Sequence, residues 1–251
     1  MKVALPARAK LNLDLQVIKR REDGFHEIRT HMQSVALHDL LEASAADRTS
    51  LTADGMLVPA GEDNVILKAL GALERASGRE LPTRFQLHKR VPPGAGLGGA
   101  SSDAATALRA AKMIHAVDVD LSKVARGVGA DVPFFLAGGL ALAEGTGELL
   151  TPLPVEPCWY AIAWPGIELS TASVYGAWDK TRGAPPNELF RAAAAADVRL
   201  QEFADSLGPG WQMTGSGSAF FKRCSRYEEA MGSIQSLDCW TAATHTVGPW
   251  S

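Results

Sequence analysis

Residues 93–102 read Pro-Gly-Ala-Gly-Leu-Gly-Gly-Ala-Ser-Ser and form the most informative stretch of the chain. Their glycines allow backbone N–H groups to turn toward a bound anion without side chains in the way. The alanine-rich run 101–112 predicts a helix directly afterwards, and a helix N-terminus adds partial positive charge at the same place. The hydroxyl groups of Ser101 and Ser102 suit phosphate oxygens or Mg²⁺. The stretch therefore predicts a loop that holds a polyphosphate.

Other interpretations of this loop exist. Gly94, Gly96 and Gly99 also fit the dinucleotide pattern G-x-G-x-x-G, and Asp118 or Asp120 follows about 20 residues later. The second buried strand that this pattern requires is poorly supported, because only valines interleave with these acids. The lysine of a Walker motif and the His-Arg-Asp and Asp-Phe-Gly motifs of protein kinases do not follow the loop. A loop that serves packing alone also stays open.

Two further segments support a polyanion site. Asp131 stands in the run 129–135, Gly-Ala-Asp-Val-Pro-Phe-Phe, at an expected helix-to-strand junction. A carboxylate there would be partly shielded, and a neighbouring cation could keep it ionised; a helix-capping aspartate is the simpler interpretation. Residues 214–218, Thr-Gly-Ser-Gly-Ser, form a second loop of glycines and hydroxyls, which alone indicates only a turn. Two such loops in one chain favour one polyanionic ligand between two lobes.

Residues 11–17 alternate between apolar and polar side chains, which is the period of a half-buried strand. Lys10 falls on the polar face of this strand together with Asn12. A lysine at the start of a strand is usually a solvated surface charge, so the position of Lys10 alone indicates little.

The remaining periodicity predicts an α+β protein with two lobes. The first half is expected to hold strands at 28–37, 40–43, 85–87, 132–136 and 140–143, and helices from Asp63 or Asn64 and over 122–128. The proline-rich run 151–157 is the expected linker, which predicts domains at 1–153 and 154–251. The second half is expected to hold strands at 159–164, 218–222 and 240–246, and helices at 172–179, 188–207 and 227–234. This order predicts a small antiparallel sheet covered by helices.

Bulk properties limit the class of function. The chain has 251 residues, of which 46% are hydrophobic and 21% charged, as in a globular protein. Its net charge of −3 argues against a nucleic-acid partner, which would need a basic face. The three cysteines lack paired spacing, and basic residues interrupt the first twenty positions. We therefore expect no signal peptide, no membrane segment and a cytoplasmic location.

In order and spacing, four motifs resemble those of the GHMP kinase superfamily, named after galactokinase, homoserine kinase, mevalonate kinase and phosphomevalonate kinase. They occupy 6–12 (Pro-Ala-Arg-Ala-Lys-Leu-Asn), 93–102, 129–133 and 214–217. Three further stretches, 20–26, 62–66 and 143–148, resemble the family within it that phosphorylates 4-diphosphocytidyl-2-C-methyl-D-erythritol. The resemblance implies a two-lobed fold, with an N-terminal lobe like domain 2 of ribosomal protein S5 and a C-terminal ferredoxin-like α/β sandwich. The active site would lie in the cleft between them.

The resemblance also implies roles for individual residues. Lys10 and Asp131 match the catalytic pair of the family. The nucleotide site would comprise Asn64, Lys89, Pro92, Pro93, Gly94, Ala95, Gly96, Leu97, Gly98, Gly99, Ala100, Ser101 and Ser102, with Ser101 also a candidate metal ligand. The acceptor site would comprise Asn12, Phe25, His26, Thr171, Tyr175 and Gly215. In it, Phe25 would stack on the cytosine, His26 would hydrogen-bond its polar edge, and Tyr175 would close the opposite side.

The implied reaction transfers the γ-phosphoryl group of ATP, with Mg²⁺, to the 2-hydroxyl group of that cytidine diphosphate compound, a step of the non-mevalonate isoprenoid pathway. A monomer or a homodimer would carry it out. Two alternatives stay open: a GHMP kinase for another acceptor, such as a sugar, homoserine or mevalonate, and a nucleotide-binding module without catalysis. Lys10 and Asp131 argue against the second alternative, because binding alone needs neither residue.

Overall fold

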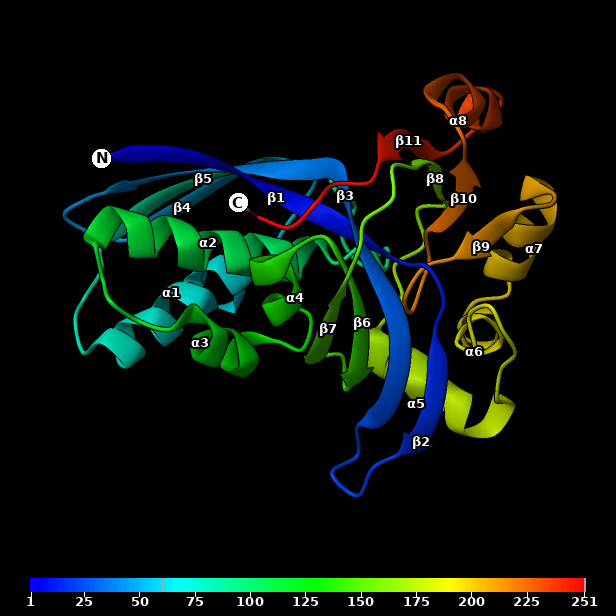
Figure 1. The fold of residues 1–251 in the computed structure, drawn as a ribbon, viewed down its shortest axis with the longest axis horizontal. Coiled ribbons are helices and arrows are strands. Elements are labelled where there is room, and N and C mark those ends of the chain that lie inside the picture. The colour runs from blue at the N-terminus through cyan, green and yellow to red at the C-terminus, as the bar shows by residue number, and fades with distance from the viewer. Residues whose placement is uncertain (60, 251) are drawn as a thin grey trace.

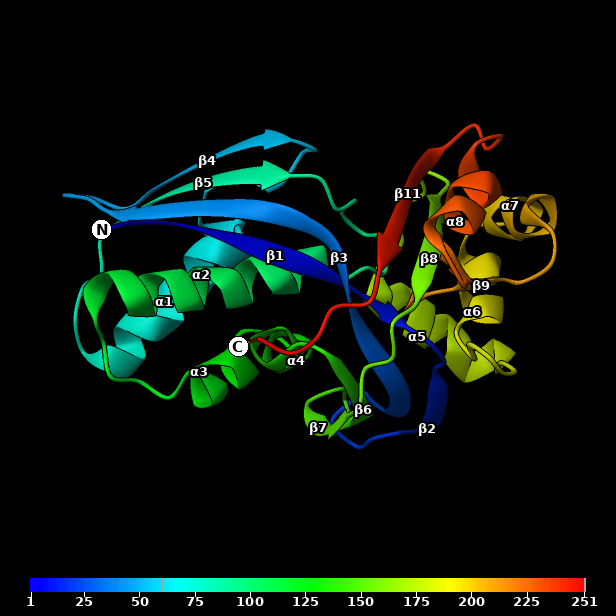
Figure 2. The ribbon, with the colours of Figure 1, turned by 45° about the horizontal axis from the view of Figure 1, so that its top comes forward.

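The computed structural model describes residues 1–59 and 61–250 and contains two β-sheets with helices packed against them (Figures 1 and 2). The larger sheet has seven strands in the order β4-β5-β3-β6-β7, and β1 and β2 pair with β3. These strands are β1 (Lys2–Asn12), β2 (Gln16–Arg20), β3 (His26–Ala45), β4 (Ser50–Gly55), β5 (Thr83–Lys89), β6 (Leu140–Gly145) and β7 (Leu149–Leu153). The architecture confirms the predicted α+β class.

The long strand β3 organises this sheet. It runs for 20 residues and pairs with β1, β2, β5 and β6, all antiparallel. The prediction of separate strands at 28–37 and 40–43 is therefore wrong. Asp39 interrupts the apolar pattern of the sequence but not the strand, in which it pairs with Ala7. Its side chain is fully buried and accepts hydrogen bonds from the backbone N–H groups of Arg90 and Val91.

The predicted strand over 11–17 is interrupted in the structure. β1 ends at Asn12 and β2 begins at Gln16. Between them, the N–H of Leu13 donates to the carbonyl of His31, and that of Leu15 donates to the carbonyl of Pro186. A period of two cannot reveal this break, because the partner at 186 comes from a distant part of the chain.

Four helices cover one face of the larger sheet (Figure 2). They are α1 (Val65–Ser77), α2 (Gly99–His115), α3 (Leu121–Val128) and α4 (Val132–Ala137), and the short helix η1 (Gly61–Asp63) precedes α1. Leu70, Leu87 and Leu108 belong to the apolar core between helices and sheet. The predicted helix start at Asn64 is confirmed, because its side chain accepts a hydrogen bond of 2.9 Å from the N–H of Ile66.

The strand predicted at 132–136 is wrong, because these residues form α4. A run of four to eight apolar residues does not distinguish a buried strand from a buried helix by periodicity. Pro133 lies in the first turn of α4, where its missing N–H has no partner to lose. Asp131 therefore lies at a junction between two helices and not between a helix and a strand.

The second sheet has four antiparallel strands in the order β11-β8-β10-β9. They are β8 (Trp159–Trp164), β9 (Trp211–Met213), β10 (Phe220–Cys224) and β11 (Trp240–His245), and the helices around them are α5 (Thr171–Thr181), α6 (Phe190–Ala196), α7 (Arg199–Leu207) and α8 (Tyr227–Ile234). β9 has three residues and was not among the expected strands. The single helix predicted for 188–207 is wrong. This segment forms two helices that are separated at Asp197. The N–H of Asp197 donates to the carbonyl of Ala193 at the end of α6, and its carboxylate accepts from the N–H of Arg199 at 3.0 Å.

Apolar clusters join the two sheets. One contains Leu11 and Val35 from the larger sheet with Ile162 and Phe221 from the smaller one.

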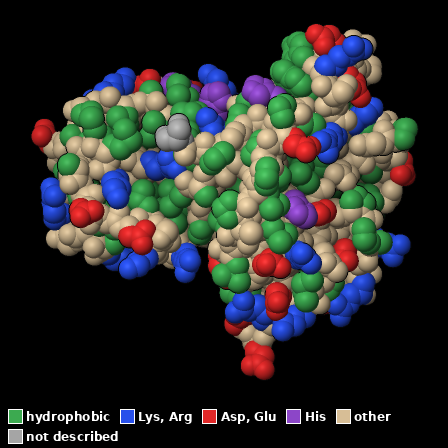
Figure 3. Space-filling view, viewed as in Figure 1, with side chains coloured by type: hydrophobic (Ala, Val, Ile, Leu, Met, Phe, Trp, Pro, Cys, Tyr) green, Lys and Arg blue, Asp and Glu red, His purple; other side chains and the backbone are tan. Residues whose placement is uncertain are grey.

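Residues 151–153 of the expected linker belong to β7, and the domain boundary at 153/154, between β7 and β8, stays a prediction. None of the helices in the described ranges has the length and apolar character that a bilayer crossing needs. On the face seen in Figure 3, basic and acidic side chains are interspersed.

Candidate active site

A cavity of about 870 Å³ lies between the two sheets and is lined by the glycine-rich loop, the ends of β1 and β3, and α5. Nearly all the residues that were predicted to form the site meet in it. The lining includes Lys10, Asn12, Phe25, His26, Asn64, Lys89, Pro92, Pro93, Gly94, Ala95, Gly96, Leu97, Gly98, Gly99, Ala100, Ser101, Asp131, Thr171, Tyr175 and Gly215. Ser102 is the exception. It is buried, and its N–H donates to Gly98 within the first turn of α2.

The glycine-rich loop and the 214–217 loop pack directly on each other. Gly96 has a φ of 78°, and a Cβ atom there would lie 2.4 Å from the carbonyl oxygen of Thr214. The N–H of Ala219 donates to the carbonyl of Ala95 at 2.9 Å and ties the second loop to the first. Only glycine permits both this backbone conformation and this approach. The two loops therefore form one continuous wall of the cavity.

Lys10 is buried and joins β1 to the glycine-rich loop. Its Nζ donates to the carbonyl of Gly96 at 2.7 Å and makes a short contact with Oδ1 of Asn12. Burial lowers the pKa of the Lys10 ammonium group, and the negative charge of Asp131 acts in the opposite direction. The interpretation of Lys10 as a solvated surface charge is therefore wrong, because the side chain faces the cavity at 4% exposure.

Asp131 directs its carboxylate away from helix capping. It occupies the N-cap position of α4 but makes no side-chain cap hydrogen bond. Its charge acts on Lys10 and on Tyr175, whose pKa is raised first by burial and second by Asp131. The Asp131 carboxylate lines the cavity. The helix-capping interpretation is therefore wrong, and the carboxylate is free to meet a ligand.

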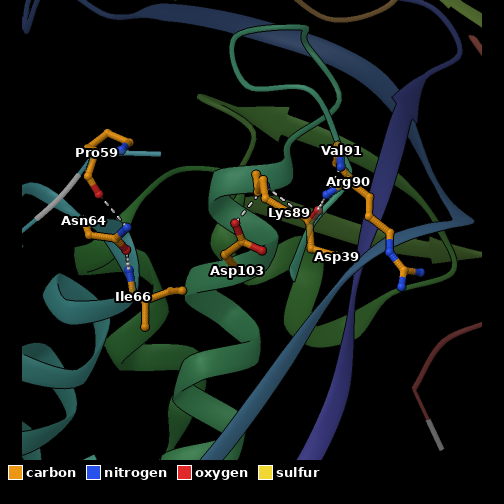
Figure 4. Close-up of polar contacts among 8 residues, drawn as sticks. All are labelled: Asp39, Pro59, Asn64, Ile66, Lys89, Arg90, Val91 and Asp103. Carbon is orange, nitrogen blue, oxygen red and sulfur yellow. Dashed lines mark hydrogen bonds and ion pairs between the residues drawn. The ribbon is translucent and has the colours of Figure 1, made fainter. Parts of the chain in front are cut away.

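A buried ionic cluster lies beside the part of the cavity that was predicted to bind the nucleotide (Figure 4). Nζ of Lys89 lies 2.5 Å from Asp39 and 2.8 Å from Asp103. Burial alone would lower the pKa of Lys89, but the charges of Asp103 and Asp39 raise it overall. Burial raises the pKa of Asp103 to about 8, against the attraction of Lys89. Oδ1 of Asp103 is buried and has no hydrogen-bond partner among the described residues.

Lys89 was predicted to contact the nucleotide, but neither of its aspartate partners was predicted from the sequence. Asp103 directly follows Ser101 and Ser102, so the sequence already placed it in the expected helix beside the glycine-rich loop, and this position could have marked it as a candidate partner of Lys89. Asp39 carried no comparable signal, because it lies 50 residues from Lys89 along the chain.

The side chain of Asn64 is committed to the fold. Its oxygen caps α1, and its Nδ2 donates to the carbonyl of Pro59 at 2.9 Å (Figure 4). Val58 and Pro59 also line the cavity. Asn64 therefore shapes this wall by fixing the segment before α1.

Among the residues predicted to form the acceptor site, His26 and Tyr175 stack on each other. Their ring centroids are 4.9 Å apart with an interplanar angle of 27°. Nε2 of His26 lies 2.8 Å from Oδ1 of Asp179, and this contact is the main reason that the pKa of Asp179 is lowered. Phe25 is 64% exposed at the mouth of the cavity. His26 is thus held in place by Asp179, a partner that the sequence analysis missed.

Asn12 and Gly215 lie beside the Lys10 ammonium group. Nδ2 of Asn12 donates to Oγ1 of Thr30 at 2.8 Å, and its backbone N–H donates to Oγ1 of Thr214 at 2.8 Å. A Cβ atom on Gly215 would come within 3.0 Å of both Nζ of Lys10 and Oδ1 of Asn12. This corner is therefore crowded with polar groups that converge between the two lobes.

The dinucleotide interpretation of the glycine-rich loop is wrong. The chain continues from the loop into α2, and Asp118 and Asp120 lie in the connection between α2 and α3 and not at the end of a second strand. Oδ1 of Asp120 accepts from the N–H of Ser122 at 3.0 Å and caps α3. Neither carboxylate is part of the cavity lining in the described residues.

Comparison with known proteins gives a consistent result. The family described as GHMP kinases N terminal domain matches residues 64–139. A 4-diphosphocytidyl-2-C-methyl-D-erythritol kinase from Pseudomonas syringae is 37% identical over 87% of this chain and 84% of its own length. The enzyme of that name from Thermus thermophilus is 35% identical over 94% and 93%. For the relatives from Chromohalobacter salexigens and Thermoanaerobacter pseudethanolicus, the match spans 65% and 63% of their length.

Solved structures agree with these matches. A crystal structure of 4-(cytidine 5'-diphospho)-2C-methyl-D-erythritol kinase superimposes with a TM-score of 0.85 at 35% identity, over 98% of this chain and 100% of that one. The mevalonate kinase of Methanococcus jannaschii shares the fold with a TM-score of 0.70 at 12% identity, over 99% and 98%.

Proposed function

Because the chain belongs to the GHMP kinases, in the family of 4-diphosphocytidyl-2-C-methyl-D-erythritol kinases, we propose that it transfers the γ-phosphoryl group of ATP to the 2-hydroxyl group of 4-diphosphocytidyl-2-C-methyl-D-erythritol. The products are the 2-phosphate and ADP. One observation carries the proposal: Lys10, which feels the charge of Asp131, donates its hydrogen bond into the glycine-rich loop at Gly96. A cation, a carboxylate and the loop proposed to bind phosphate thus line the same cavity.

Asp131 is the proposed general base. It would accept the proton of the acceptor hydroxyl group as the new O–P bond forms and the bond to the leaving ADP breaks. Its carboxylate serves no helix cap, so it can turn toward a ligand without cost to α4. Lys10 would stabilise the negative charge that develops between donor and acceptor, because a buried cation acts there in a medium of low dielectric constant.

The glycine-rich loop would hold the ATP phosphates. N–H groups of residues 94–99 and the N-terminus of α2 provide donors and positive potential for them. Mg²⁺ usually takes only one or two protein oxygens together with substrate phosphates. In this chain the Ser101 hydroxyl, which lines the cavity beside the glycine-rich loop, would hold the ion. Bound there, the ion would neutralise charge on the transferred group.

His26, Tyr175 and Phe25 are the proposed cytosine contacts. Tyr175 already lies parallel to the His26 ring, and exposed Phe25 stands at the cavity mouth. Flat aromatic surfaces favour a base over a small aliphatic acid such as mevalonate or homoserine.

We also propose a cytoplasmic location, since the three cysteines are free thiols. Light scattering of the purified chain would distinguish the monomer from the homodimer.

A coupled ADP-release assay tests the proposal. The wild-type chain is incubated with ATP, Mg²⁺ and, in parallel, the cytidyl compound, a sugar, homoserine and mevalonate. We expect ADP release above the ATP-only background with the cytidyl compound alone. Release with another acceptor would reassign the substrate, and ATP binding without release in any mixture would indicate a nucleotide-binding module.

A further inference from the structure

We infer that Trp250 is a positioning residue that holds α4, and with it the Asp131 carboxylate, in the geometry needed for phosphoryl transfer. The inference rests on the proposed function. After β11 the chain leaves the smaller sheet and runs back over β1 to α4 (Figures 1 and 2). On this path Val247 donates its N–H to the carbonyl of Ser34 at 3.0 Å, and Pro249 bridges to Gly138 at the end of α4.

Trp250 donates hydrogen bonds to carbonyl groups at the C-terminal end of α4. The last carbonyl groups of a helix have no partner within it. The indole Nε1–H of Trp250 donates to the carbonyl of Phe135 at 2.9 Å, and the backbone N–H of Trp250 donates to the carbonyl of Ala137 at 3.1 Å. The carbonyl of Leu136, between these two, accepts from the guanidinium group of Arg109. Three consecutive carbonyl groups of α4 are therefore capped by one small cluster.

The Trp250 ring contacts two guanidinium groups. Cζ of Arg8 lies 4.0 Å from the ring centroid, and Cζ of Arg109 lies 4.7 Å from it. A cation over the face of an indole ring is attracted by the negative potential of that face. Arg8 belongs to β1, two residues before Lys10, and Arg109 belongs to α2. One ring thus connects α4 to the strand that carries Lys10 and to the helix that follows the glycine-rich loop.

Displacement of Trp250 would reach the active site through α4. The helix has six residues and is roughly 9 Å long, with Asp131 at one end and the Trp250 contacts at the other. Phe135 accepts the Trp250 Nε1–H through its carbonyl group, and its ring packs on Gly98 of the glycine-rich loop. Trp250 itself does not line the described cavity. A misplacement of about 1 Å at a reacting group can reduce a rate roughly 100-fold.

Steady-state kinetics and hydrogen exchange test this role with Trp250→Ala, Trp250→Phe and the control Trp159→Ala. Trp159 is half-buried on the smaller sheet, where it packs on Tyr227 and His245 outside the cavity lining. For Trp250→Ala we expect kcat to fall between tenfold and 100-fold, KM for ATP and for the acceptor to change less than threefold, and α4 amides to exchange faster. Trp250→Phe keeps an aromatic ring beside both arginines but loses the Nε1 donor, so its kcat should lie between those of wild type and Trp250→Ala.

The outcomes separate a positioning role from a merely structural one. Trp159→Ala should lower the melting temperature and leave kcat within threefold of wild type. If wild type is active and Trp250→Ala has the same kcat, the inference about Trp250 is wrong while the proposed function stands. The same holds if Trp159→Ala loses as much kcat as Trp250→Ala. A wild-type chain without transferase activity on any acceptor would overturn the proposed function, and this inference with it.

Discussion

Phe135 packs against the backbone of Gly98 so closely that a Cβ atom on Gly98 would lie 2.5 Å from Cζ of the ring. Phe135 belongs to α4, which begins directly after Asp131, and Gly98 is the N-cap residue of α2. The contact therefore joins the helix that presents the proposed base to the loop that is proposed to hold the phosphates.

Gly98→Ala should reduce ATP affinity at least tenfold and destabilise the protein. The φ of 72° at Gly98 is unfavourable for alanine, and the new methyl group would collide with the Phe135 ring. Isothermal titration with ATP and urea unfolding measure the two effects. Gly127→Ala in α3 is the matched control. It has an ordinary φ and nothing within 4 Å of the added Cβ atom, so it should bind ATP like wild type and gain up to about 1 kcal/mol in stability. Equal ATP binding by both variants would contradict the prediction.

Asp131→Asn should lose at least two decades of kcat while its dissociation constant for ATP stays within threefold of wild type. The amide cannot accept the hydroxyl proton, and general-base assistance contributes roughly 10²–10⁴-fold. Its N-cap position should tolerate the change, because the carboxylate makes no capping hydrogen bond. Asp47→Asn, at an exposed position, is the control and should keep full activity. A wild-type kcat in Asp131→Asn would remove Asp131 from the mechanism.

Asp103 should give the wild-type protein a stability that declines with rising pH. The pKa of this buried carboxyl group is raised from its ordinary value of 3.8 to about 8, so between these values the folded state holds a proton that the unfolded state has released. The stabilisation is full below about pH 4 and is lost as pH rises through about 8. Asp103→Asn cannot titrate and should lack this slope. Urea unfolding at pH 6 and pH 8.5 measures the difference.

The stability of wild type relative to Asp103→Asn should therefore be lower at pH 8.5 than at pH 6, and a constant or growing advantage would contradict the assignment. Asp39→Asn is the comparison variant. Its carboxylate accepts from two backbone N–H groups and pairs with Lys89, so its loss should destabilise the protein by about 3 kcal/mol at both pH values.

Phe25→Ala should raise the KM for the cytidyl acceptor about tenfold and leave ATP affinity unchanged. Loss of one aromatic stacking surface corresponds to roughly 0.5–1.5 kcal/mol. Because Phe25 is 64% exposed, the free energy of unfolding should change by less than about 0.5 kcal/mol. Ile18→Ala on neighbouring β2, where the side chain is 47% exposed, should leave both constants as they are. An unchanged acceptor KM in Phe25→Ala would exclude the pocket assignment.

Local patterns predicted many elements well. The strand 159–164 and the helix 227–234 have the expected bounds, because each is an apolar or amphipathic run between clear breaks. The errors fall where the deciding contact is distant. Asp39 lies within the continuous strand β3, where it pairs with Ala7 of β1 and its carboxylate accepts hydrogen bonds from residues 90 and 91. α4 is helical although its six apolar residues carry no diagnostic period.

From sequence alone, the motifs around Lys10, Gly96 and Asp131 determined the kind of chemistry, because backbone freedom and side-chain charge are properties of the residues themselves. Only the tertiary structure decided which groups support them. Lys89 meets Asp39 across 50 residues, and Trp250 meets Phe135 across 115. Such contacts follow from the pairing of β3 and the path of the chain after β11, and no short-range pattern encodes a partner that far away.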